Sequence, residues 1–302
     1  MSTRFSSESS EPLAPETVTR PADAIQPLGF ALLVDQDWVV RRVSANIDLF
    51  LQVDPTACAG LALSQVLSED AVHSLRNRVA LLREPLDVTR LFACRAGAGE
   101  ERFDFFIRTA EDSILIEGRP SGRAEHGDNA EMVRALIGRL DAAHGVKAML
   151  TEAVMQLRAM TGYDRVACYG FTDGDSSSLV AQSARKLGAA PECLPEWFEC
   201  GTRLLIDGAG TSVPMLPDDG ETMRCDALFG AVDTRRQAWL DERGAAAAMV
   251  GGLAIGSTVW GSIACDHPTA RPITIDRQAA FELYADMLGM KLEIAELRAN
   301  AG

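Results

Sequence analysis

The sequence lacks the residue patterns that mark the common enzyme classes. It has no GxxxxGK(S/T) phosphate-binding loop, no GxSxG nucleophile motif and no HExxH zinc motif. The seven cysteines are scattered without a CxxC pair, and the four histidines lie far apart. We therefore predict a protein that is not an enzyme, with no catalytic residues and no metal site.

Long hydrophobic runs are also missing. The longest apolar stretch, residues 244–256, is too short and too rich in glycine to span a bilayer, and the first residues lack the apolar core of a secretory signal. Unpaired cysteines in an odd number are typical of reduced thiols. These features predict a cytoplasmic protein.

Positive charge is scarce. The 302 residues include 43 acidic and 29 basic side chains, which gives a net charge of −14. A surface of that sign repels phosphate backbones and anionic lipids, so we expect neither a nucleic-acid nor a membrane partner. The 47% hydrophobic content is sufficient for two domains with packed cores.

The first half of the chain shows a strand-rich pattern after a polar start. Residues 1–22 are rich in Ser, Pro, Glu and Thr and are predicted to form a disordered N-terminal arm. "GFALLV" and "WVVRRVS" predict a hairpin, and "SANIDLFL" and "SEDAVHSLRNRVALLRE" predict helices, the second capped by Ser68. Three further strands are predicted by "LDVTRLFACR", "ERFDFFIRTA" and "SILIEGRP". This order is typical of a PAS domain, which we assign to residues 23–119.

The second half alternates long helices with hairpins. A polar linker over residues 120–130 precedes a helical stretch that is broken near Gly145. The hairpin "RVACYGFT"/"SLVAQSAR", the short helix "RRQAWLDERG" and the strands "AAAAMVGGLAIG" and "TVWGSIACDH" follow. A last helix runs from Ile275 to Asn300. The layout predicts a GAF domain over residues 131–302, so the fold class is α+β, a PAS domain followed by a GAF domain, each an antiparallel sheet with helices.

The last helix has more apolar positions than one narrow stripe requires. They are Phe281, Leu283, Tyr284, Met287, Leu288, Met290, Leu292, Ile294 and Leu297. We expect one face to pack on the GAF sheet and a second face to pair with another subunit. The sequence therefore predicts a homodimer that forms through the GAF helices, chiefly the last helix and the helix from Met132.

Four segments resemble bacteriophytochromes in the right order and spacing. "AIQPLGFALLV" with "VSANIDLFL" resembles the start of their PAS domain, and "TGYDRVACYGF", "WLDERGAAAAM" and "VWGSIACDH" resemble successive parts of their GAF domain. The resemblance covers roughly residues 23–297. It implies that Ile25, Gln26 and Pro27 thread a lasso formed by about residues 207–234, which makes a figure-of-eight knot.

The resemblance also implies a bilin chromophore, biliverdin in the bacterial family, but the attachment residues differ here. The bacterial attachment cysteine precedes the IQP stretch at a place that falls near Leu13 and Ala14. Plant and cyanobacterial relatives use a cysteine followed by a histidine, and these positions fall at Arg235 and Arg236. We therefore predict that this chain has lost covalent bilin attachment and carries no cofactor.

The non-covalent contacts that the resemblance implies are also replaced. The positions of the chromophore-organising aspartate, a propionate-binding arginine, two serines and the first of two histidines are Cys193, Gly230, Ala248, Val250 and Asp266. Burial of a bilin without partners for its carboxylates costs several kcal/mol. We predict a pocket closed by Leu194, Trp197, Phe198 and Met223. The candidate pocket residues are Tyr169, Phe171, Cys193, Arg203, Arg236 and His267.

Three functions agree with these observations. The leading hypothesis is a non-enzymatic phytochrome-like signalling or interaction module that engages a sensor kinase or another signalling protein. The second is a receptor whose GAF cavity binds a bilin non-covalently or another small molecule, with Arg235 and Arg236 as possible anion contacts. The third is the light-sensing fragment of a larger bacteriophytochrome.

Overall fold

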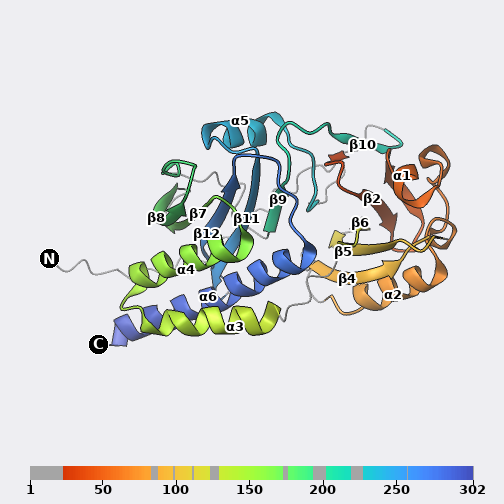
Figure 1. Ribbon diagram of the computed structural model, residues 1–302. Helices are drawn as coiled ribbons and strands as arrows, with labels where there is room; N and C mark the ends of the chain where they lie inside the picture. The colour runs from red at the N-terminus through yellow and green to blue at the C-terminus, as the bar shows by residue number, and fades with distance from the viewer. Residues whose placement is uncertain are drawn as a thin grey trace.

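Two antiparallel sheets, each with its own helices, make up the computed structural model (Figure 1). The structure describes residues 23–82, 88–97, 99–110, 112–122, 129–172, 176–192, 202–218, 227–256 and 258–301. The α+β class with two antiparallel sheets that the sequence predicts is confirmed. The segments 1–22 and 123–128, which include the predicted arm and most of the linker, lie outside the described residues.

The first sheet has seven strands in the order β1-β10-β3-β2-β6-β5-β4. Its elements from the first part of the chain are β1 (Ala24–Ile25), β2 (Phe30–Asp35), β3 (Val40–Ser44), α1 (Asp48–Leu51), α2 (Glu69–Val79), β4 (Val88–Arg95), β5 (Arg102–Ala110) and β6 (Ser113–Pro120). The side chain of Ser68 accepts a hydrogen bond from the backbone N–H of Ala71, so the predicted cap of α2 is present.

The second sheet has five strands in the order β8-β7-β12-β11-β9. The elements of the second part of the chain are α3 (Asn129–Arg139), α4 (Val146–Thr161), β7 (Arg165–Thr172), β8 (Ser176–Ala184), β9 (Thr202–Leu205), β10 (Val213–Leu216), α5 (Thr234–Glu242), β11 (Ala247–Ile255), β12 (Thr258–His267) and α6 (Ile275–Ala301). Helices α3, α4 and α6 cover one face, and α5 covers the other (Figure 1). Among the described residues, no helix is long and apolar enough to cross a membrane.

Alternation along the strands divides the second sheet into two cores. On β7, Val166 and Cys168 pack against α4 and α6, whereas Ala167 and Tyr169 pack on the α5 side. On β11, Met249 belongs to the helix-side core, and its two neighbours belong to the core under α5. The core under α5 is the smaller of the two, and it contains the sequence-predicted pocket residue Tyr169.

Strand β10 connects the two halves of the molecule. It comes from the second part of the chain but pairs with β1 and β3 in the first sheet, with Pro214 opposite Ala24 and Met215 opposite Ser44. Strands β1, β9 and β10 are short and were not predicted from the sequence. The pairing of β1 with β10 and the bridge between Ile25 and Gly230 bring the residues before β2 into direct contact with the segment that leads to α5.

A close approach between α6 and β11 gives a testable consequence. A Cβ atom added at Gly289 would overlap the carbonyl oxygen of Ala254, whereas one added at Gly138, on the exposed side of α3, would meet no atom. We expect Gly289→Ala to destabilise the fold by about 1–3 kcal/mol, because α6 must move away from the sheet. Gly138→Ala is the matched control and should stabilise it by up to about 1 kcal/mol. Urea unfolding of both variants measures the difference, and equal midpoints would contradict this packing.

Candidate functional site

Tyr169 lies fully buried at the centre of the face that α5 covers. Its hydroxyl group donates a hydrogen bond to the carbonyl oxygen of Pro191 at 2.9 Å and accepts one from Nη1 of Arg243 at 3.0 Å. Burial raises the pKa of Tyr169, so the phenol stays protonated at neutral pH. Both hydrogen-bonding functions of the hydroxyl group are therefore used inside the protein.

Asp266, at the end of β12, holds two arginine side chains. Its Oδ2 accepts from Nε of Arg165 at 2.8 Å and from Nη2 of Arg243 at 2.7 Å, and its Oδ1 accepts from Nε of Arg243 at 2.9 Å. All three side chains are at most 2% exposed. A carboxylate in this position makes the burial of two positive charges tolerable.

Both arginines make further contacts around the carboxylate. Arg165 donates to the carbonyl oxygens of Gly188, Ala189 and Arg243 at 2.8–3.2 Å. The guanidinium of Arg243 lies 4.5 Å from the ring centre of Trp239 on α5. Burial opposes the charged form of Arg243, but Asp266 and Tyr169 outweigh it and raise the pKa of the guanidinium. We call Arg165, Tyr169, Arg243 and Asp266 the Arg–Asp–Tyr cluster.

Apolar side chains surround the Arg–Asp–Tyr cluster. Ala248 and Val250, which stand at the serine positions that the family resemblance implies, are buried on the same face of the sheet as Tyr169. They pack together with Leu205, Trp239, Leu240, Ala245 and Ala264. In the described part of the chain, this face is thus covered by apolar side chains that pack together and by the Arg–Asp–Tyr cluster.

The structure does not bring all of the predicted pocket residues together. Phe171 and Arg203 are half-buried on β7 and β9. The guanidinium of Arg236 donates to the carbonyl oxygen of Ala231 at 2.6 Å, within the loop that precedes α5. The candidate Cys193 lies outside the described residues, and so do Leu13, Ala14, Leu194, Trp197, Phe198 and Met223.

His267 lies on the opposite face of β12 from the Arg–Asp–Tyr cluster. Its ring packs edge-on against Tyr163 at 6.1 Å, in the helix-side core, and its Nδ1 lies 3.0 Å from the carbonyl oxygen of Thr269. Side chains alternate along a strand, so the residue that reaches Tyr169's face is Asp266. The expectation that His267 and Tyr169 share one pocket does not match this geometry.

Sequence reasoning missed three members of the Arg–Asp–Tyr cluster, namely Arg165, Arg243 and Asp266. Two of them stand at the ends of apolar strand segments, Arg165 before "VACYGF" and Asp266 after "SIAC", and the third follows α5 in "DERG". A charged residue that is buried at the end of an apolar strand requires a partner, because an isolated buried charge is too costly. Two such charges of opposite sign were the available signal.

A second polar centre joins the segment before β2 to the second part of the chain. The side chain of Gln26 is 4% exposed. Its Nε2 donates to the carbonyl oxygens of Leu204 and Gly230 at 2.7 and 3.1 Å, and its Oε1 accepts from the N–H of Ile206 at 2.7 Å. Gln26 is therefore bonded both to β9 and to the segment that leads into α5.

Comparison with known proteins identifies relatives for the whole arrangement. A family profile described as PAS fold matches residues 14–120. The chain is 24% identical to the phytochrome-like protein Cph1 of Synechocystis sp. over 91% of its length, and 22% identical to a bacteriophytochrome of Pseudomonas aeruginosa over 90%. It spans about 40% of the length of these curated relatives.

A solved structure shares the fold across both sheets. The chromophore-binding domain of the bacteriophytochrome RpBphP3 from R. palustris superposes with a TM-score of 0.77 at 21% identity, over 93% of this chain and 97% of that one. The fold and the sequence comparisons together show homology to the phytochrome-like PAS/GAF chromophore-binding domain. The sequence relatives are phytochrome-like proteins, and the solved structure that shares the fold is a chromophore-binding domain.

Proposed function

We propose that this chain is a phytochrome-like signalling module that attaches no bilin and acts through protein contacts in the cytoplasm. The observation that carries the proposal is the Arg–Asp–Tyr cluster, which fills the face of the second sheet where the resemblance implies the chromophore. The domains we assign are PAS over 23–119, a linker over 120–130 and GAF over 131–302.

The energetics of the Arg–Asp–Tyr cluster support a pocket without pigment. A bilin that entered this face would have to displace Arg243 from Asp266 and Tyr169. Breaking a buried ion pair costs about 3–5 kcal/mol. The free energy of unfolding of a typical domain is only about 5–15 kcal/mol, so this cost is a large share of it. The apolar residues Ala248 and Val250 offer no hydrogen bonds in exchange. Neither covalent nor tight non-covalent bilin binding is therefore expected.

Threading of the N-terminal segment is part of the proposal. Gln26 is bonded to both ends of the segment between Leu204 and Gly230, and Ile25 forms a bridge with Gly230. These contacts support the figure-of-eight knot that the resemblance implies. The knot would fix the two domains relative to each other without requiring a chromophore.

A receptor function is the second candidate, and one observation favours it. A shallow pocket of about 420 Å³ lies beside the start of α5. It is lined by Gly208, Val232, Asp233, Thr234, Gln237, Ala238 and Asp241. The two carboxylates disfavour an anionic ligand such as a bilin, so the pocket would suit a small neutral or cationic molecule.

Co-expression with a biliverdin source tests the proposal. We expect colourless protein, with no far-red absorbance band and no zinc-dependent fluorescent band on a denaturing gel. The variant Ala14→Cys should also stay colourless, because the Arg–Asp–Tyr cluster still occupies the face. A phytochrome expressed in the same way is the positive control. A fluorescent band from the unmodified chain contradicts the proposal, and so does colour that is lost on denaturation, because it would mean that the chain binds a bilin non-covalently.

A further inference from the structure

One face of the first sheet contacts two separate parts of the second half of the chain. Arg90 on β4, Phe106 on β5 and Glu117 on β6 are successive cross-strand neighbours. Cross-strand neighbours on one face stand about 4.5–5.5 Å apart, so the three side chains form a continuous row. We call this row the PAS row.

Glu117 forms one end of the PAS row and binds the segment before α5. Its carboxylate accepts hydrogen bonds from the backbone N–H groups of Leu228 and Phe229 at 2.9 and 2.7 Å, and the residue is 2% exposed. Phe106, next in the row, packs edge-on against Phe229 at 5.3 Å. Charge-assisted hydrogen bonds in a buried setting are among the stronger polar contacts in proteins.

Arg90 forms the other end of the PAS row and binds α6. Its guanidinium pairs with the carboxylate of Glu282 and lies 5.6 Å from the ring centre of Phe106. Gln278 donates to the other oxygen of Glu282 at 3.0 Å. The Arg90 and Glu282 side chains are only about one-fifth exposed, so solvent screens this pair less than an ordinary surface pair.

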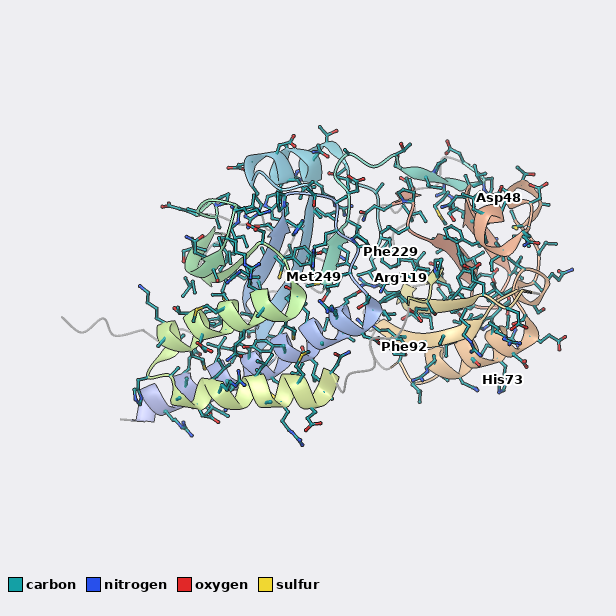
Figure 2. The ribbon with its side chains drawn as sticks, viewed as in Figure 1. Asp48, His73, Phe92, Arg119, Phe229 and Met249 are labelled. Atoms are coloured by element: carbon teal, nitrogen blue, oxygen red, sulfur yellow. The ribbon has the colours of Figure 1, made fainter. Side chains whose placement is uncertain are left out.

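Arg119 lies beside the PAS row and contacts both the segment before α5 and the residues just before α6. Figure 2 shows Arg119 and Phe229 side by side between the two sheets, and the guanidinium lies 5.7 Å from the Phe229 ring centre. It also lies 5.5 Å from the Phe106 ring centre and donates to the carbonyl oxygen of Ile273, just before α6. Phe106 is thus held between two arginines that both contact the α6 region.

We propose that the PAS row couples the segment at residues 227–231 to α6, so that a change at one end alters the stability of the other. The 227–231 segment leads directly into α5, which covers the Arg–Asp–Tyr cluster. The α6 helix carries exposed apolar positions, a surface for the protein contacts through which the proposed function acts. The inference rests on that proposed function and names the route by which the GAF face under α5 would regulate it.

Hydrogen–deuterium exchange on the full chain tests the coupling. We expect Glu117→Gln to speed exchange of amides in the 227–231 segment and, at a distance, in the α6 region around residues 278–290. Arg90→Gln should produce the same two effects from the other end. The expected increase in α6 exchange is about fivefold for each variant, as for a local opening that loses one buried charged contact.

A matched control comes from the same strand as Arg90. Arg95 pairs with Glu100 at 3.0 Å within the first domain and is half-exposed. Arg95→Gln removes the same charge from β4 and should leave exchange of both distant regions unchanged. Thermal melts of all variants identify any that fail to fold, and Arg90→Gln, at a partly exposed site, keeps the test available if Glu117→Gln does not fold.

The double variant separates coupling from two local effects. The double variant carries both Glu117→Gln and Arg90→Gln. If the PAS row connects both ends, the exchange rate of α6 in this variant should be no higher than in the single variant with the larger effect. Additive increases, or a Glu117→Gln effect confined to residues 227–231, would overturn the inference. The readout does not require dimerisation or a ligand. A chain that binds bilin would therefore refute the proposed function while this result stands on its own.

Discussion

Replacement of Asp266 with alanine is expected to lower the free energy of unfolding by about 3–5 kcal/mol. The carboxylate has no exposed surface, and it is the shared partner of Arg165 and Arg243. Its removal leaves two buried guanidinium groups without a counter-charge, and Arg243, which donates to the Tyr169 hydroxyl group, loses the carboxylate that orients it. Urea unfolding followed by tryptophan fluorescence measures the change.

An exposed ion pair provides the control for this prediction. Glu100 is 91% exposed where it pairs with Arg95, so Glu100→Ala should change stability by no more than about 0.5 kcal/mol. Asp266→Asn keeps the size of the side chain but removes its charge, and it should remain strongly destabilising. A loss below about 1 kcal/mol for both Asp266 variants would mean that water or a rearrangement compensates the arginines, and that the face is less closed than proposed.

The long helices and the paired strands were predictable because their patterns are local. The apolar spacing in α4 and α6, the Ser68 cap of α2 and the strand-like runs of β5 and β6 are all properties of neighbouring residues. Strands β1, β9 and β10 carry two to four residues each. They exist because distant segments pair with them, and a single sequence gives no measure of such pairing.

The site was only partly predictable for a related reason. Tyr169 was identified from its place in a strand that resembles the family, but its partners depend on which face of each strand α5 covers. At the end of β12 the sequence offers Asp266 and His267 side by side, and only the register with β7 decides that Asp266 faces inward. A buried arginine after α5 could not be matched to that carboxylate before the fold was known.

Replacement of both Met290 and Ile294 on α6 with glutamate should convert a dimer into a soluble monomer. In the isolated chain these side chains are 63% and 45% exposed, and Leu283 and Leu297 on the same helix are 40% and 63% exposed. Leu283, Met290 and Leu297 recur at a seven-residue spacing, and Met287 and Ile294 lie between them. This heptad pattern is the one by which two helices pack side chains between each other.

The expected effect on association is large because both changes introduce charge into an apolar seam. Each buried apolar side chain contributes about 1.5–3 kcal/mol, so loss of two should weaken dimerisation by at least about a hundredfold. Sedimentation velocity at about tens of micromolar, where interfaces of standard size remain formed, provides the measurement. Arg78→Glu on α2 changes the net charge by the same amount at an exposed position of the first domain, and it should leave the dimer intact. If the unmodified chain sediments as a monomer at that concentration, the exposed stripe on α6 does not pair two copies, and a different protein must be sought as its partner.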